Sequence, residues 1–213
     1  MTIRIDGPIV ADADKWLYDW FGEPAVSPAA LRVQMPQNSH EPLVVWINSP
    51  GGDMAAGGVI YCMLMEHKGD VTVKIDGDAA SAASLIAMAG NQVLVSPLGM
   101  MMIHRVWTIA QGNAREMEQA GQMLDEADEA CINAYEIKTG LPRAEIFTLM
   151  EANTWMSAAR AVELGFADGM LYQDKPGTMA MAARAASIAH GYNSTDALMQ
   201  RAQAMIDLEK MRY

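Results

Sequence analysis

The sequence predicts an α/β fold with a repeated strand–turn–helix plan, and two patterns lead to this prediction. Between residues 42 and 105 strand-like and helix-like segments alternate, which is typical of βαβ units with right-handed crossovers. From residue 113 to residue 138 apolar residues recur at helical spacing, which predicts one long amphipathic helix. The chain has 213 residues, of which 51% are hydrophobic and 19% charged, so it is long enough for one domain with a sizeable core.

The first forty residues are expected to hold a strand, an acidic and aromatic stretch over 12–23 and a short helix. We expect the aromatic side chains of that stretch to lie in the core or at a subunit contact; they are Trp16, Tyr18, Trp20 and Phe21. The run 42–48 is nearly all apolar, as in a strand buried on both faces. The Ser-Pro-Gly-Gly turn that follows should end this strand abruptly.

The glycine turn is the first candidate for a functional element. Gly51 and Gly52 permit positive φ angles and let another chain approach the backbone closely. From Ala56 onward apolar residues fall at helical spacing, so the turn also opens a helix whose positive end favours negative charge. Free N–H groups at such a turn are suited to an oxyanion hole.

The second strand–turn–helix unit presents a serine. Apolar and polar residues alternate over 71–76, which predicts a strand, and Gly77 and Asp78 are expected to end it. Residues 81–90 have the pattern of a helix of small residues that ends at a glycine. Ser81 would on local grounds be an N-cap, but the alanines around it leave its hydroxyl free of bulk, which suits a nucleophile. Ser84 is the rival candidate and ranks below Ser81, because three residues further on it faces the helix interior.

The third unit supplies a histidine. Residues 92–95 and 100–105 are expected to form two short strands joined by a turn, which would leave His104 at a strand end facing a site. A single histidine is more often structural than catalytic, but His104 alone of the four histidines follows a buried apolar run. Ser81 and His104 together match the nucleophile and base of a serine hydrolase.

The remaining elements follow from capping signals. The long helix should end at 139–142, a second helix should cover 143–150, and Ser157 should be the N-cap of a third over 158–164. Asp168 is expected to satisfy a turn. Residues 171–213 are rich in Ala and Met and poorly punctuated, so we divide the chain into a catalytic domain over 1–170 and an appendage over 171–213 that is either mobile or removed by processing.

Several of these segments, taken in order, resemble the ClpP family of serine peptidases. They are INSPGGD, DGDAASAAS with the following IAMAG, MMIH, and NTWMSAARAVELGFAD. Within the family they are most similar to the head maturation (prohead) proteases of tailed phages. The resemblance runs from about residue 3 to about residue 170. It implies a ClpP/crotonase-like fold with a superhelical βαβ core, in which 113–138 is the protruding handle through which rings meet.

The resemblance also implies roles for single residues. Ser81 becomes the nucleophile and His104 the general base, Gly52 and Ala82 supply the N–H groups of the oxyanion hole, and Gly51 belongs to the substrate-binding turn. The family usually has a carboxylate before its aromatic-x-Ser-Ala segment, and the matching residue here is Asn153. An amide can hold the imidazole ring but lacks the charge that stabilises an imidazolium.

Three explanations of Asn153 remain open at this point. It forms a working Ser-His-Asn arrangement, or an acidic neighbour such as Glu151 takes its place, or the chain is a slow or disabled variant. We favour the first.

Together with this resemblance, the residues imply a serine endopeptidase with no metal and no cofactor. The resemblance further implies that the enzyme assembles into a homo-oligomeric ring and cleaves capsid, scaffold or portal precursors. The alternatives are a ClpP-like general protein-degrading subunit working with an unfoldase, a crotonase-fold acyl-CoA enzyme, and a catalytically weakened ring-forming assembly protein. The chain enters a strand pattern almost at once, without the long N-terminal segment through which ClpP meets an ATPase. An unfoldase partner is therefore not expected.

Charge and cysteine usage bound the remaining possibilities. The net charge of −11 provides no basic patch, so a nucleic-acid partner is not expected. Cys62 and Cys131 fall within expected helices without metal-ligand spacing. No apolar run is long enough to cross a bilayer, and the N-terminal residues lack the pattern of a secretory signal. A cytoplasmic location and no membrane partner are therefore expected.

Overall fold

A mostly parallel, seven-stranded sheet organises the computed structural model, which describes residues 1–173. The strands are β1 (Thr2–Asp6), β2 (Leu43–Ser49), β3 (Val71–Ala80), β4 (Gln92–Val95), β5 (Met100–Ile103), β6 (Thr154–Ser157) and β7 (Gly169–Met170). They lie in the order β1-β2-β3-β4-β7, and β5 pairs with both β3 and β6. Neighbouring strands are parallel except β5 and β6, which are antiparallel. The predicted α/β class is confirmed.

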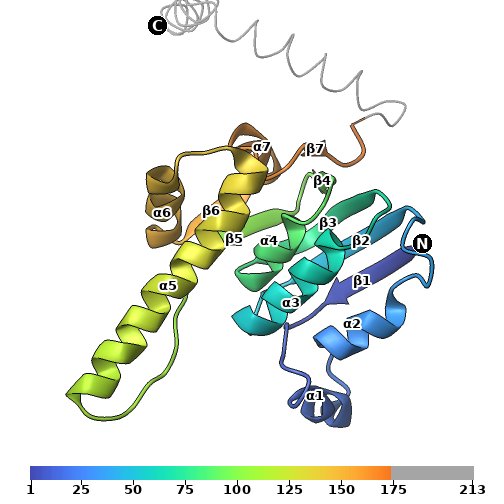
Figure 1. Cartoon of the computed structure of the whole chain (residues 1–213). Helices are drawn as coiled ribbons and strands as arrows, with labels where there is room; N and C mark the ends of the chain where they lie inside the picture. The colour runs from blue at the N-terminus through green and yellow to red at the C-terminus, as the bar shows by residue number, and fades with distance from the viewer. Residues whose placement is uncertain (174–213) are drawn as a thin grey trace, which may run out of the picture. The chain divides into compact units, whose positions relative to one another are not determined.

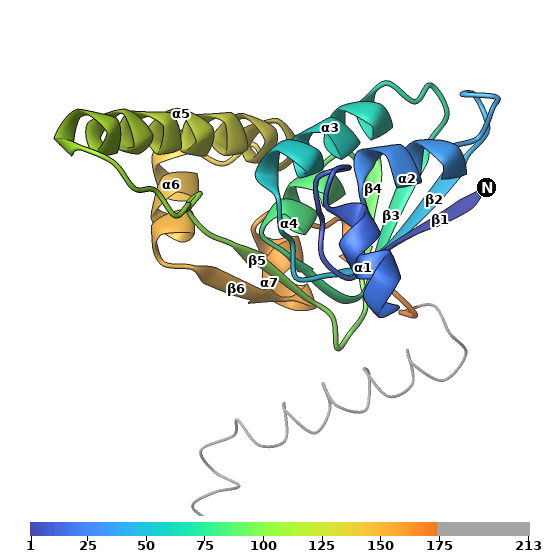
Figure 2. The ribbon, with the colours of Figure 1, turned by 90° about the horizontal axis from the view of Figure 1, so that it is seen from below.

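The helices are α1 (Lys15–Phe21), α2 (Pro28–Gln34), α3 (Met54–Met65), α4 (Ala82–Ala87), α5 (Ala114–Thr139), α6 (Arg143–Glu151) and α7 (Ala158–Glu163). In both Figure 1 and Figure 2, α5 is a long helix that projects well beyond the sheet, as the handle was expected to do. Asn113 and Glu116 form a reciprocal capping box at its start. Of the helices in residues 1–173, none is both long and apolar enough to span a membrane.

Residues 1–171 form one compact unit whose core lies on the sheet. On β2 the side chains alternate, so that Leu43, Val45 and Ile47 are fully buried while Val44 and Trp46 are half-buried. The expectation of a strand buried equally on both faces is therefore wrong. On the second face, the long cationic side chains of Arg4 and Lys74 lie over the Trp46 ring, at 5.9 and 5.3 Å from its centroid.

The Gly77-Asp78 pair does not end the strand of the second strand–turn–helix unit, contrary to the prediction from sequence. β3 continues to Ala80, and its partner changes along its length from β4, opposite 72–75, to β5, opposite 78–80. The Asn48 side chain fills the bend, since its Oδ1 accepts a hydrogen bond from the Asp78 amide at 3.2 Å. A Cβ on Gly77 would lie 2.2 Å from that oxygen, which explains why glycine stands at the bend.

Two further expectations have opposite outcomes. Ser157 is the N-cap of α7, with its hydroxyl accepting from the Arg160 amide, so the expected start of this helix is confirmed.

The aromatic residues of α1 do not enter the core, because the helix buries none of its residues and Trp20 and Phe21 are 74% and 68% exposed. The appendage predicted over 171–213 lies, beyond residue 173, outside the described residues.

We predict that Gly77→Ala destabilises the fold by about 1–3 kcal/mol, because the new methyl group must displace Asn48 and break its hydrogen bond to Asp78. Gly58→Ala is the matched control, since a Cβ there meets nothing within 4 Å and alanine favours the middle of α3. Urea unfolding should show a lower midpoint for the first variant and an unchanged or higher one for the second. Equal midpoints would contradict the account of the bend.

Candidate active site

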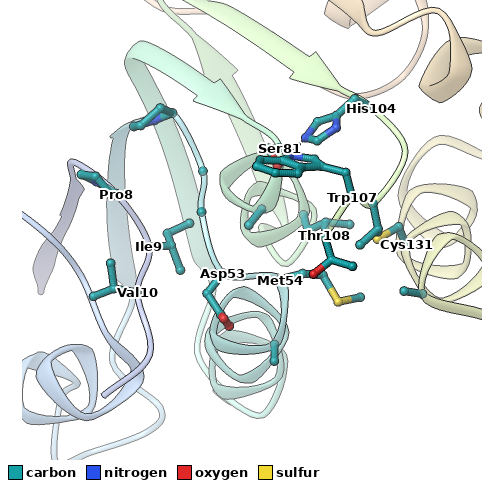
Figure 3. A pocket seen from close by; sticks show the side chains of 18 of the residues that line it. Pro8, Ile9, Val10, Asp53, Met54, Ser81, His104, Trp107, Thr108 and Cys131 are labelled. Carbon is teal, nitrogen blue, oxygen red and sulfur yellow. Dashed lines mark hydrogen bonds between the residues drawn. The ribbon is translucent and has the colours of Figure 1, made fainter. Parts of the chain in front are cut away.

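All six site residues expected from the sequence line one open cavity of about 1110 Å³. They are Gly51, Gly52, Ser81, Ala82, His104 and Asn153. Figure 3 shows this cavity, with Ser81 and His104 close together on its wall. The cavity therefore brings together residues from segments that are more than a hundred positions apart in the chain.

Ser81 and His104 are brought together by the register of two parallel strands. Ala80 of β3 pairs with Met102 of β5, so the serine and the histidine follow one and two residues later at the same edge of the sheet. The Ser81 amide donates to the Met102 carbonyl at 2.8 Å, which extends this pairing into the site. His104 Nε2 then lies 2.7 Å from Ser81 Oγ.

The backbone at Ser81 is strained in a way that an N-cap would not require. Its φ of 54° and ψ of −126° are rare for a residue with a side chain and cost on the order of 1–3 kcal/mol. Its hydroxyl makes no capping bond to α4. The sharp turn from β3 into α4 instead directs the half-buried Ser81 toward His104, so the capping interpretation is wrong.

The glycine turn lies directly against this serine. A Cβ on Gly51, whose φ is +90°, would be 2.6 Å from Ser81 Cβ and 3.0 Å from the Ala82 nitrogen. Only glycine permits this approach. The Gly51 amide donates to Ser49 Oγ at 3.1 Å, whereas the amides of Gly52 and Ala82 donate to no acceptor within residues 1–173. The two amides that remain free are those expected in the oxyanion hole.

Ile9 is hydrogen-bonded to the same turn, which the sequence did not predict. Its amide donates to the Gly51 carbonyl and its carbonyl accepts from the Asp53 amide, both at 2.8 Å. A Cβ on Gly52, at φ +145°, would lie 2.1 Å from the Ile9 carbonyl oxygen. The N-terminal segment thus fixes the turn that carries a candidate donor. No local signal marks this role, because it depends on pairing across more than forty residues.

Ser84, the rival nucleophile, is excluded from the cavity. It is fully buried, its hydroxyl lies 2.6 Å from the Ser81 carbonyl oxygen, and it also contacts the Tyr135 hydroxyl at 2.8 Å. A hydroxyl held in this way cannot reach a substrate. Ranking Ser81 above it agrees with the geometry.

Asn153 lies at the cavity but is not joined to the histidine. It follows α6 with a φ of 49°, its side chain is exposed, and within residues 1–173 no hydrogen bond connects it to His104. Glu151, the alternative, is exposed at the end of α6 and does not line the cavity. The structure therefore holds a serine–histidine pair, with Asn153 on the wall of the same cavity but not hydrogen-bonded to the histidine.

Asp128 is a buried carboxylate that the sequence analysis missed. It is 2% exposed, accepts from Arg105 Nε at 2.7 Å and accepts from the Val106 amide at 2.6 Å. It therefore ties the two residues after His104 to α5. The hydrogen bond to Asp128 is also the main cause of the raised pKa of Arg105. An acidic residue inside the apolar stripe of the long helix, between positions 127 and 131, was the signal available in the sequence.

The wall that α5 contributes is electrically neutral. Burial raises the pKa of the Cys131 thiol to about 12, and burial likewise raises the pKa of the Tyr135 phenol above its ordinary value. Both groups stay protonated at physiological pH. Leu124 and Ala127 complete this side of the cavity, which offers an uncharged surface next to Ser81.

Asp168 has a structural role, as expected. Its hydrogen-bond partners, however, lie far away in the sequence and not within its own turn. Its carboxylate accepts from the Val93 amide at 2.7 Å and from Lys138 Nζ at 2.8 Å. It therefore joins β4 to the end of α5, away from the cavity.

A serine at a strand-to-helix turn, a histidine directly after the neighbouring strand and free main-chain amides beside them form an arrangement that is typical of serine hydrolases. A family model described as Clp protease matches residues 29–174. The chain belongs to the Clp protease family, a family of serine peptidases.

Curated relatives agree with this assignment. ATP-dependent Clp protease proteolytic subunit 1 of Chlamydia muridarum is 29% identical over 136 residues, which cover 62% of this chain and 71% of the relative. The corresponding subunit of Deinococcus radiodurans is 28% identical over 141 residues, covering 65% and 69%. That of Ligilactobacillus salivarius is 30% identical over 141 residues, covering 65% and 72%.

We predict that Asp128→Asn destabilises the protein by about 1–3 kcal/mol, because the amide nitrogen would oppose Arg105 while the site remains buried. The estimate is below that for a fully buried pair because the Arg105 side chain is 39% exposed. Asp125→Asn is the matched control, since this second partner of Arg105 is 72% exposed and should cost under about 0.5 kcal/mol. Thermal and urea unfolding of both variants provide the measurement, and equal losses would contradict an anchoring role for Asp128.

Proposed function

We propose that this chain is a serine endopeptidase of the Clp type in which Ser81 is the nucleophile and His104 the general base. The observation that carries the proposal is the 2.7 Å contact between Ser81 Oγ and His104 Nε2 at the wall of an open cavity. A crotonase-fold acyl-CoA enzyme would not need this pair. A peptidase does, because an unassisted serine hydroxyl is a weak nucleophile.

The reaction follows from the groups at the cavity. His104 Nε2 takes the proton as Ser81 Oγ forms a bond to the scissile carbonyl carbon, and the carbonyl electron pair moves onto oxygen. The imidazolium then gives its proton to the leaving amine as the C–N bond breaks, which leaves an acyl-enzyme at Ser81. A water molecule, deprotonated by the same imidazole, releases the acid and restores the hydroxyl.

Gly52 and Ala82 are proposed as the donors to the oxyanion. Their amides are free of other acceptors among the described residues and lie on either side of Ser81, on the glycine turn and at the start of α4. Loss of one donor of this kind costs two to three orders of magnitude in rate. Gly51 is proposed to keep the substrate backbone close to the serine, since no side chain fits there.

Asn153 is proposed as the third member of a Ser-His-Asn site. Its place on the wall of the same cavity supports this role, and because it is not bonded to His104, a rotation of its exposed side chain or a shift of the segment after α6 must precede it. Residues 1–170 are proposed to form the catalytic domain, with residues 171–213 as an appendage to it.

The substrate is proposed to be polypeptide, and the working form a homo-oligomeric ring in the bacterial cytoplasm. Closed cyclic symmetry would make a chamber from one repeated interface. The resemblance of the motifs to prohead proteases supports phage head maturation as the setting, with capsid, scaffold or portal precursors as substrates.

A general degradative subunit is the second candidate, because the relatives are named ATP-dependent Clp protease proteolytic subunits. The two settings are separable. Cleavage of a capsid precursor without ATP would support maturation, whereas degradation of a folded protein only with an ATP-driven unfoldase would support the second candidate. The mass of the intact assembly would give the ring size in either case.

We predict that a fluorophosphonate probe labels the wild-type chain at Ser81 and does not label Ser81→Ala. Ser84→Ala tests the rival serine and should still be labelled at position 81, although more slowly, because the buried Ser84 hydroxyl contacts the Ser81 carbonyl but cannot reach the probe. Peptide mapping by mass spectrometry locates the adduct. An unlabelled wild-type protein that also fails to cleave an unfolded protein would remove the peptidase proposal.

We predict that Asn153→Asp raises the labelling rate at neutral pH by roughly 10–10³-fold, because a carboxylate stabilises the imidazolium that an amide cannot. The labelling rate of each protein is measured as a function of pH. Asn153→Ala is the control and should lower the rate if the amide orients the ring. Identical pH–rate profiles for all three proteins would exclude residue 153 from the site.

A further inference from the structure

The peptide between Ser81 and Ala82 is hydrogen-bonded to Ser84 through its carbonyl oxygen. Its carbonyl oxygen accepts from Ser84 Oγ at 2.6 Å and from the Ser84 amide at 2.9 Å. In a trans peptide the N–H points opposite to the C=O, and no bond in residues 1–173 is cis. The interior contacts of Ser81 therefore set the direction of the Ala82 N–H, which is a proposed oxyanion donor.

A chain of two hydroxyl groups leads from this carbonyl to the long helix. Ser84 Oγ lies 2.6 Å from the Ser81 carbonyl and 2.8 Å from the Tyr135 hydroxyl, and both side chains are almost fully buried. A carbonyl can only accept, so the single Ser84 hydrogen is committed to Ser81. The Tyr135 hydroxyl must then be the donor to Ser84. Burial raises the pKa of Tyr135, which keeps that proton in place.

Tyr135 is itself held firmly enough to act as an anchor. Its ring packs edge-on against Phe166, with ring centroids 5.5 Å apart and an interplanar angle of 61°. Its backbone carbonyl accepts from Thr139 Oγ1 at 2.8 Å. Because Tyr135 lies on α5, two hydrogen bonds link this projecting helix to the Ser81–Ala82 peptide.

We propose that Tyr135 and Ser84 are positioning residues that orient and polarise the Ser81–Ala82 peptide, so that the Ala82 N–H is aimed at the developing oxyanion. This inference rests on the proposed peptidase function. Hydrogen bonds in a chain strengthen one another, and a carbonyl that accepts strongly makes the N–H of the same peptide a better donor. The strained φ of Ser81 adds to the need for such a restraint.

The test uses the full chain and measures fluorophosphonate labelling as a function of probe concentration and pH. Tyr135→Phe removes one hydroxyl and keeps the ring, and we expect the maximum labelling rate to fall about 3–10-fold. Ser84→Ala removes the donor to the carbonyl, and we expect a fall of about 10–50-fold. In both variants the probe concentration at half-maximal rate and the pH midpoint should stay unchanged, because neither binding nor His104 is altered.

The double variant and a matched tyrosine complete the experiment. Tyr135→Phe with Ser84→Ala should react about as slowly as Ser84→Ala alone, since the tyrosine acts only through the serine. Tyr61→Phe removes the hydroxyl of a half-buried tyrosine on α3 outside the cavity and should react at the wild-type rate. Circular dichroism establishes that each variant is folded; should Ser84→Ala not fold, the Tyr135→Phe and Tyr61→Phe pair decides alone.

Each outcome is decisive for one proposal. If the wild-type chain is labelled at Ser81 and Tyr135→Phe is labelled at the same rate, the positioning role is overturned and the peptidase proposal stays intact. A shifted pH midpoint would also overturn it, because that result would mean a general loosening around His104. Failure of the wild-type chain itself to react at Ser81 would instead overturn the peptidase proposal on which this one rests.

Discussion

The parallel pairing of β3 with β5 is the constraint on which the site depends. With Ala80 opposite Met102, the serine and the histidine follow at the same edge of the sheet, and no long loop has to be ordered to bring them together. A shift of this register by one residue would turn every side chain of β5 to the other face of the sheet. Met101 and Ile103 are fully buried, so such a shift would expose two core residues, and the core therefore protects the geometry of the site.

The sequence was sufficient for those features that local patterns encode. Strand and helix periodicity predicted the α/β class, and the small residues around Ser81 together with the strand-end position of His104 predicted a pair that the structure brings within hydrogen-bond distance. The bend at Gly77 was misjudged, because a glycine in a strand can mark either an end or a bend, and only the distant Asn48 decides between them. Asp128 and Tyr135 were missed as site supports for the same reason, since each acts on a residue far away in the chain.

The supports of the site come from the N-terminal segment and from α5, which explains how a strained serine can be maintained. Ile9 holds the glycine turn by two main-chain hydrogen bonds, while α5 holds the opposite side through Asp128 and Tyr135. Strained backbone persists only where the surroundings over-determine it. The α1 aromatic residues do not contribute to this support within one chain, because they are largely exposed, and a subunit contact is the part of their prediction that stays open.

The amide at position 153 is not imposed by the fold. A φ of 49° is in the left-handed region, where asparagine and aspartate are both tolerated, so the backbone would accept a carboxylate equally well. The side chain is exposed, so a charge there would carry little desolvation cost. Neither strain nor burial therefore explains why residue 153 is an amide rather than a carboxylate. As a result, Asn153 supplies no negative charge to stabilise a protonated His104. The main-chain donors are the other source of transition-state stabilisation at the proposed site, and the glycine turn and the Tyr135–Ser84 contacts lie directly beside them.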